Sequence, residues 1–192
     1  MSEFPFVLAV ISGVLALGSF IPYIVTTLQG TTKPNRVTWC IWTLQGWILT
    51  STYYLSGGEH NIWLPLADTV LVSVIAILSL RYGAAAYTKV DIFSVFGALV
   101  SILLWILLGS PLTALYFGIA VSLIGAVPTL VKTYRAPETE NSLSWGIFSC
   151  AAIINLLALP TLWAAENIYP FYLLFINGAI FLLAFFGKRL HL

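Results

Sequence analysis

Long hydrophobic runs alternate with short polar segments along the whole chain. Seven of these runs could cross a hydrocarbon layer of about 30 Å as helices. We expect helix cores at 5–28, 37–56, 62–81, 92–109, 112–134, 143–164 and 168–187. Because the runs are continuous and do not alternate with polar residues, they favour helices over the strands of a membrane barrel. The pattern predicts an all-α integral membrane protein with seven spans.

The composition restricts the class of partner. Of the 192 residues 60% are hydrophobic and 8% are charged, whereas soluble domains have about 25% charged residues. The formal net charge is +1, and no basic run provides an electrostatic footprint for nucleic acid. We therefore expect a lipid bilayer around the chain and no nucleic acid partner.

All basic residues fall on one side of the predicted helices. They follow the odd-numbered spans, at Lys33, Arg36, Arg81, Lys89, Lys132, Arg135, Lys188 and Arg189. The other side carries Glu3, Glu59, His60 and Glu166. Because Lys and Arg accumulate in cytoplasmic loops, we expect the N-terminus outside, the C-terminus in the cytoplasm and a multi-pass location in the plasma (inner) membrane. The first span lacks the basic flank and cleavage site of a signal peptide, so we expect it to be retained.

An internal repeat relates the two ends of the chain. An offset of 106 residues places Pro22 on Pro128 and Trp39 on Trp145 without a gap. Proline and tryptophan matches in one register are informative, whereas matches between hydrophobic residues are common in this composition. The chain therefore contains two copies of one unit.

The repeat predicts how the chain is organised. The expected parts are a first three-helix unit at 1–85, a linker helix at 86–110 (span four) and a second three-helix unit at 111–192. A three-helix unit ends on the side opposite its start, so span four restores the orientation of the second unit. Parallel repeats about an axis along the membrane normal occur in secondary carriers.

This three-plus-one-plus-three plan resembles the SWEET sugar transporters and the wider PQ-loop (MtN3-like) superfamily. The resemblance is carried by the segments from Pro22 to Trp39 and from Pro128 to Trp145. Each has a proline late in a helix, a short basic loop and a Ser/Thr-containing entry to the next helix. The Asn177-Gly178 pair is similar to the Asn-Gly of the family's seventh helix, which implies that Asn177 faces the substrate.

The chain also differs from that family. The glutamine that gives the PQ-loop its name is Tyr23 in the first unit and Thr129 in the second. The pocket tryptophans of sugar-carrying relatives have no clear match, since Tyr53 and Tyr54 lie near one expected position and Pro160 near the other. The class of solute therefore stays open among sugar-like, amino-acid-like and vitamin-like molecules.

Polar residues near the middle of the spans are the candidate substrate contacts. They are Asp68, Asn177, Gln45, Trp47, Asn155 and Tyr53. The repeat pairs Asn177 with Leu71, or with Asp68 after a three-residue gap. Either pairing puts two polar groups at similar depth on matching helices.

Asp68 is the one carboxylate within a predicted span. A carboxylate near the bilayer centre costs about 2.5–3.5 kcal/mol on insertion scales, so it should point into the bundle. It could contact the solute, couple transport to protons, or make a structural hydrogen bond to Thr43 or Gln45. These three roles stay open from the sequence.

Two prolines are the candidate hinges. Pro22 and Pro128 leave the carbonyls of Gly18 and Ile124 without their helical donors. Paired bending at one depth could open one side while the other closes, and a static kink is the alternative. We place Trp39 and Trp145 in the aromatic belt at the cytoplasmic interface.

No catalytic arrangement is recognisable. The sequence has no glycine-rich phosphate loop, no serine with a plausible base and no pair of carboxylates within the spans. Cys40 and Cys150 lie in apolar stretches without metal-ligand spacing. We therefore expect no enzyme, no cofactor and no metal.

The leading hypothesis is an alternating-access carrier for a small polar solute, and the other is a non-transporting membrane receptor or interaction protein. A homo-oligomer is compatible with both.

Overall fold

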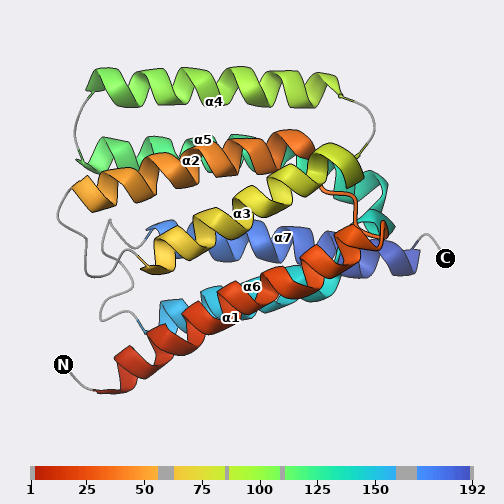
Figure 1. The fold of residues 1–192 in the computed structure, drawn as a ribbon, viewed down its shortest axis with the longest axis horizontal. Helices are drawn as coiled ribbons and strands as arrows, with labels where there is room; N and C mark the ends of the chain where they lie inside the picture. The colour runs from red at the N-terminus through yellow and green to blue at the C-terminus, as the bar shows by residue number, and fades with distance from the viewer. Residues whose placement is uncertain (1–2, 56–62, 85–86, 109–110, 159–167, 191–192) are drawn as a thin grey trace.

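In the residues that the computed structural model describes, seven α-helices form one elongated bundle (Figure 1). The structure describes residues 3–55, 63–84, 87–108, 111–158 and 168–190. The helices are α1 (Glu3–Leu28), α2 (Arg36–Leu55), α3 (Trp63–Tyr82), α4 (Lys89–Leu108), α5 (Pro111–Arg135), α6 (Ser142–Leu157) and α7 (Ile168–Leu190), with the short 3₁₀ turn η2 (Pro137–Thr139) before α6. These bounds agree with the predicted runs to within a few residues, except that α6 ends at Leu157.

Three of the helices contain stretches that are long and apolar enough to cross a membrane. Within the described residues they are Pro5–Leu28 in α1, Tyr116–Arg135 in α5 and Pro170–Gly187 in α7. The fold is therefore all-α and is consistent with a membrane protein.

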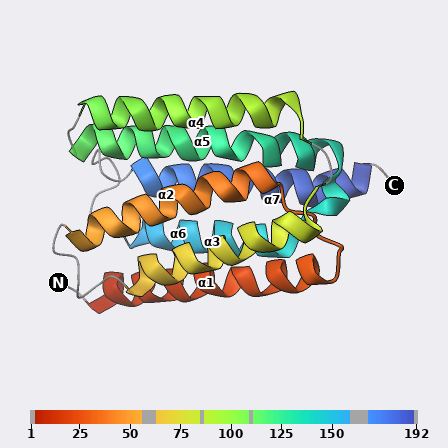
Figure 2. The same cartoon turned by 45° about the horizontal axis from the view of Figure 1, so that its top comes forward.

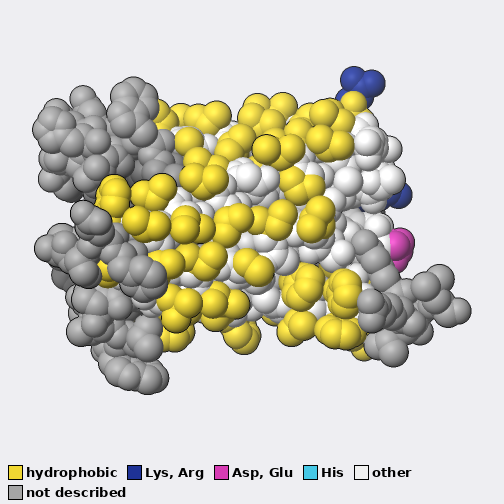
Figure 3. Space-filling model, turned by 90° about the horizontal axis from the view of Figure 1, so that it is seen from below, with side chains coloured by type: hydrophobic (Ala, Val, Ile, Leu, Met, Phe, Trp, Pro, Cys, Tyr) yellow, Lys and Arg dark blue, Asp and Glu magenta, His cyan; other side chains and the backbone are white. Residues whose placement is uncertain are grey.

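Large hydrophobic side chains cover the outside of the bundle. On α4, Phe93 is 73% exposed and Ile106 is 69% exposed. Figure 3 shows hydrophobic side chains along the length of one face, with charged side chains gathered at one end. That end, here called the basic end, carries Lys33, Arg36, Arg81, Lys89, Lys132 and Arg135. Soluble monomers rarely expose apolar patches larger than a few hundred Å², so lipid suits this surface better than water.

The helix contacts have a two-fold pattern. In the first half α3 packs against α1 and α2, and in the second half α7 packs against α5 and α6. Between the halves, α1 packs against α6 and α2 against α5. Exchange of α1, α2 and α3 for α5, α6 and α7 turns each of these contacts into another. The linker helix α4 lies against α5 at the edge of the bundle (Figure 2).

Equivalent hydrogen bonds join the two halves. The Ser12 hydroxyl of α1 donates to the Ala151 carbonyl of α6 over 2.9 Å. The Gln45 side chain of α2 donates to the Gly118 carbonyl of α5 over 2.8 Å. The 106-residue offset superposes Ser12 on Gly118 and Gln45 on Ala151. The α1–α6 contact and the α2–α5 contact therefore carry a hydrogen bond at equivalent positions. The side-chain donor is on α1 in the first contact and on α2 in the second.

An asparagine caps the second helix of each half. The Oδ1 atom of Asn35 accepts from the Thr38 amide at 3.0 Å, and that of Asn141 accepts from the Ser144 amide at 2.9 Å. Such a cap satisfies one of the amides that the first turn leaves without a partner. The Asn141 side chain also donates to the Thr26 hydroxyl at 3.0 Å. It therefore fixes α6 and ties the second half to the first.

The buried positions of α3 match those of α7 at an offset that differs from the 106 residues relating α1 to α5 and α2 to α6. An offset of 105 pairs the fully buried residues Ile75 with Ile180 and Ser79 with Ala184. The ungapped offset of 106 would instead put buried Ala76 on Leu182, which is 51% exposed. The ungapped pairing of Asn177 with Leu71 therefore does not fit the packing.

The gapped pairing of Asp68 with Asn177 preserves the helix faces. It corresponds to an offset of 109, which differs from 105 by four residues, or about one helical turn. Asp68 and Asn177 therefore lie on corresponding faces of α3 and α7. Asp68 is about one turn nearer the end of the bundle opposite the basic end.

The apolar core fills the part of the bundle nearer the basic end. Its fully or almost fully buried members include Phe20, Tyr23, Ile75 and Ile180. Trp39 and Trp145 are 2% and 1% exposed, and their ring centroids are 6.2 Å apart. The placement of these two tryptophans in a lipid-facing belt was therefore wrong. They lie near the basic end and turn inward, so their rings meet between the two halves.

The cap at Asn141 gives a stability prediction. Asn141→Ala removes both the cap and the bond to Thr26, so we expect it to destabilise the fold by about 1–2 kcal/mol. Thr26→Val removes this bond and the one that the Thr32 hydroxyl donates to Thr26, and leaves the cap intact. Thermal unfolding in detergent should rank the variants as wild type, Thr26→Val and Asn141→Ala in order of decreasing stability. Equal midpoints for Asn141→Ala and wild type would show that the cap contributes nothing.

Candidate functional site

The third helices of the two halves face each other across the centre of the bundle. The contacts of α1 with α6 and of α2 with α5 hold the halves together on either side, whereas α3 and α7 are not a closely packed helix pair. Apolar side chains, among them Val72, Ile75, Ile176 and Ile180, pack into one cluster toward the basic end. Beyond this cluster, Asp68 lies on α3 toward the end of the bundle opposite the basic end.

Asp68 lies on the inward face of α3 and is nevertheless exposed. Ile75 and Ser79 share that face and have 0% exposure. Ile75 lies seven residues, or about 10 Å, further along the helix. The inward face of α3 is therefore sealed toward the basic end and accessible at Asp68.

The structural alternative for Asp68 is not seen. Within the described residues its carboxylate makes no hydrogen bond and no ion pair. Neither expected partner bonds to Asp68. The Thr43 hydroxyl is buried without a hydrogen-bond partner among the described residues, and the Gln45 side chain donates to the Gly118 carbonyl. Asp68 is therefore free to bind a solute or a proton.

Asn177 and Asn155 also lie on inward faces. Asn177 is 8% exposed, next to the core residue Ile176 of α7. A Cβ atom placed on the adjacent Gly178 would meet no atom within 4 Å. Asn155 is half-buried and lies on the face of α6 that carries buried Ala151 and Ala152. The structure thus brings three of the candidates, Asp68, Asn177 and Asn155, to the inner surface.

Gln45 has a structural role in this arrangement. Its amide donates to the Gly118 carbonyl, and its carbonyl accepts from the Ser122 hydroxyl. The Ser122 carbonyl in turn accepts from Nε1 of Trp42 at 3.2 Å. Both ends of the Gln45 side chain are therefore used to join α2 to α5. Ser122 received no role from the sequence, because a lone serine in an apolar helix gives no signal of its own.

The remaining candidates of α2 do not add to this inner surface. Trp47 is 44% exposed, on the same outer stripe of α2 as Cys40 and Leu44, and its Nε1 donates to the Ser73 hydroxyl at 3.1 Å. The side chain of Tyr53 lies outside the described residues.

The two prolines lie within continuous helices. α1 runs through Pro22 and α5 runs through Pro128 without interruption. The carbonyl of Pro22 accepts from the Thr26 hydroxyl at 2.8 Å. Bending at these prolines stays a prediction, since this structure has a single conformation.

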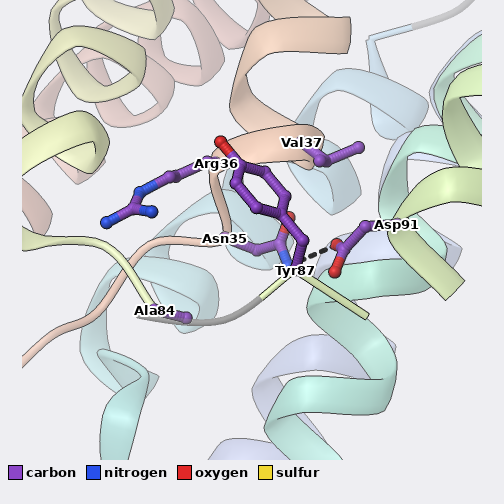
Figure 4. A pocket seen from close by; sticks show the side chains of 6 residues that line it. All are labelled: Asn35, Arg36, Val37, Ala84, Tyr87 and Asp91. Carbon is purple, nitrogen blue, oxygen red and sulfur yellow. Dashed lines mark hydrogen bonds between the residues drawn. The ribbon is translucent and has the colours of Figure 1, made fainter. Parts of the chain in front are cut away.

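A small pocket at the basic end has a structural purpose. Its lining residues are Asn35, Arg36, Val37, Ala84, Tyr87 and Asp91 (Figure 4). The Asp91 carboxylate accepts from Asn35 at 2.9 Å and from the Thr88 amide at 2.6 Å. In Figure 4 the guanidinium of Arg36 points away from Asp91, and its Nε donates to the Ser79 carbonyl. Asp91 therefore anchors α4 to the cap of α2.

A buried carboxylate at the basic end escaped the sequence analysis. Glu140 is 1% exposed and forms an ion pair with Lys132. Its Oε1 accepts from the Tyr23 hydroxyl at 3.3 Å and its Oε2 accepts from Nε1 of Trp145 at 2.8 Å. The repeat contained a signal for it, because the position equivalent to Glu140 is Pro34. Because the first half has a proline at this position, the charge of Glu140 is not required by the fold that both halves share.

Metal ligation is not indicated in the described part of the chain, where no three His, Cys, Asp or Glu side chains come together. Cys40 and Cys150 are free and exposed.

No family model, curated protein or solved structure matches the chain. The resemblance to the SWEET and PQ-loop proteins therefore stays a prediction.

The contacts of Gln45 predict a loss of stability on substitution. Gln45→Met keeps the length of the side chain but leaves the Ser122 hydroxyl without its acceptor, so we expect a loss of about 1 kcal/mol. Gln29→Met is the matched control, because Gln29 is exposed after the end of α1. Thermal unfolding in detergent should show a lower midpoint for Gln45→Met only. A midpoint equal to that of the control would show that the bonds of Gln45 to Gly118 and Ser122 contribute nothing to stability.

Proposed function

We propose that this protein is a membrane carrier that moves a small polar solute by alternating access. Seven spans cross the membrane as two three-helix units joined by α4, with the N-terminus outside and the basic end in the cytoplasm. The solute binds between α3 and α7. The observation that carries the proposal is Asp68, an exposed carboxylate on the helix face that also carries fully buried Ile75 and Ser79.

The packing of the helices supports two halves that move against each other. Contacts between the halves run along two edges, α1 with α6 and α2 with α5, and these edges are equivalent under exchange of the halves. A centre between equivalent halves can open to either side through small rotations about the same contacts. The exposed apolar side chains and the one-sided basic residues support the orientation in the membrane.

The chemistry of the centre favours a solute with hydrogen-bond donors. An ionised carboxylate only accepts hydrogen bonds, whereas the Asn177 amide both donates and accepts. No Lys, Arg or His lies near Asp68 in α3, because the first basic residue of that helix is Arg81. Hydroxyl or amine groups on a sugar-like, amino-acid-like or vitamin-like solute would satisfy the carboxylate. A proton bound by Asp68 is the alternative that would couple transport to pH.

The second candidate is a receptor or interaction protein without transport. The free carboxylate of Asp68 favours the carrier, because an unpaired charge within a bilayer is costly and is typical of substrate and ion pathways.

Thiol labelling tests the topology. With Cys40 and Cys150 replaced by serine, a cysteine at position 2 (Ser2→Cys) should react with an impermeant maleimide from outside intact cells, because the basic residues hold the other end in the cytoplasm. Lys89→Cys is the matched control and should react only in inverted vesicles. Labelling of Ser2→Cys only in inverted vesicles would contradict the proposed orientation.

Flux in reconstituted vesicles tests the function. A panel of sugars, amino acids and vitamins should include a solute that the wild-type protein moves. Asp68→Asn keeps the size of the side chain but cannot titrate, so we expect the fold to be retained, the flux to fall about tenfold or more and any pH dependence to vanish. Glu138→Gln, the same change at an exposed loop residue, should transport normally.

The outcomes separate the roles of Asp68. An unchanged pH profile with reduced flux would exclude proton coupling through Asp68 and leave a solute contact. No flux of any solute on the panel would favour the receptor.

A further inference from the structure

We propose that Glu140 is the centre of a latch that holds the two halves together at the basic end and must open to release solute there. The latch comprises Glu140, Lys132, Trp145 and Tyr23. The inference rests on the proposed function, since a latch has a purpose only if the halves separate.

The latch joins residues of different halves. Glu140, Lys132 and Trp145 belong to the second half, and Tyr23 belongs to the first. The Tyr23 hydroxyl donates to Glu140 at 3.3 Å. The Lys132 ammonium donates to Glu140 and also to the Lys33 carbonyl of the first half at 2.5 Å. One carboxylate therefore organises two contacts across the boundary.

Further contacts between the two halves lie beside the latch, at the same depth in the bundle. The Lys33 amide donates to the Thr139 carbonyl at 2.9 Å. The Thr129 hydroxyl donates to that of Thr38 at 2.9 Å. The rings of Tyr23 and Trp145 meet edge to face, with centroids 5.8 Å apart. Solute cannot pass between the halves here while these contacts persist.

Burial makes the latch sensitive to the charge of Glu140. The Glu140 side chain is 0% exposed and that of Lys132 is 12% exposed. A buried ion pair loses stability when one partner is removed, because the other is left without compensation. Separation of the halves would instead let water solvate both charges. Both partners belong to the second half, so the pair acts on the boundary by holding the Glu140 carboxylate for Tyr23 and the Lys132 ammonium for the Lys33 carbonyl.

The latch is absent from the repeat-equivalent positions. The 106-residue offset places Glu140 on Pro34 and Lys132 on Thr26. A charge pair required for the fold of each unit would be expected in both. A single pair at the boundary between the halves suits a contact that forms and breaks.

The proposal is tested by the accessibility, from the cytoplasmic side, of a buried residue that lies further from the basic end than the latch. Ala126 is 0% exposed and packs in the same core cluster as Trp39 and Trp145. Ala126→Cys, in a background with Cys40 and Cys150 replaced by serine, serves as the reporter in inverted vesicles. The measured quantity is the rate of alkylation by an impermeant maleimide from the cytoplasmic side.

Glu140→Gln should raise this rate at least tenfold, because the ammonium of Lys132 loses its counter-charge and the carboxylate no longer organises the bonds of Tyr23 and Lys132 across the boundary. Tyr23→Phe, which removes only the hydroxyl between the halves, should raise the rate less. Glu138→Gln is the matched control, since it removes a carboxylate from an exposed position in the same loop, and it should leave the rate within twofold of the parent.

Parental rates for both Glu140→Gln and Tyr23→Phe would overturn the latch. If Glu140→Gln does not fold, as judged by gel filtration and thermal unfolding, the rate for Tyr23→Phe decides. The labelling needs no flux, so the two proposals can fail separately. A raised rate with no transported solute would keep the latch and reject the carrier, whereas flux with an unchanged rate would keep the carrier and reject the latch.

Discussion

Hydrogen bonding without water is the constraint on which this structure depends. In a bilayer, each polar group must find its partner within the protein or line a cavity. Ser12, Gln45 and Asn141 meet this need with bonds to the opposite half. The polar groups of the bundle therefore hold the halves in register, while the apolar side chains on the outside provide no preference for one arrangement of helices over another in lipid.

The same constraint gives the two ends of the centre different properties. Toward the basic end, paired aromatic rings and the ion pair of Glu140 with Lys132 fill the space between the halves. At Asp68 the carboxylate has no partner in the described residues and is exposed. The two carboxylates therefore differ in their surroundings, since Glu140 is buried with its charge paired and Asp68 is exposed without a partner in the described residues.

The sequence predicted the helices well because hydrophobic runs of this length leave few alternatives. It also predicted the repeat, since Asn35 and Asn141 cap α2 and α6 in the same way. It could not predict the direction in which a side chain points. Trp39 and Trp145 suited an interface by depth alone, and only the packing of α2 and α6 turns them inward.

The candidate site was predicted in part for the same reason. Depth along a helix follows from the sequence, so Asp68, Asn177 and Asn155 were placed at similar depth, and their role in binding a solute stays a prediction. Helix rotation depends on neighbours, so Trp47 was placed inside although it lies on the outer stripe. Gln45 has the correct depth and face but is already bonded to Gly118.

The differences between the halves are more informative than their likeness. The repeat explains the caps, the prolines and the helix contacts, all of which serve the fold. Where it fails, at Glu140 against Pro34 and at Gln45 against Ala151, a polar side chain stands in one half only. The two halves run parallel, so their exchange keeps the two ends of the bundle distinct, and both halves place basic residues at the basic end. Polar groups carried by one half only, Glu140 at the basic end and Gln45 between α2 and α5, therefore make the contacts of one half differ from those of the other.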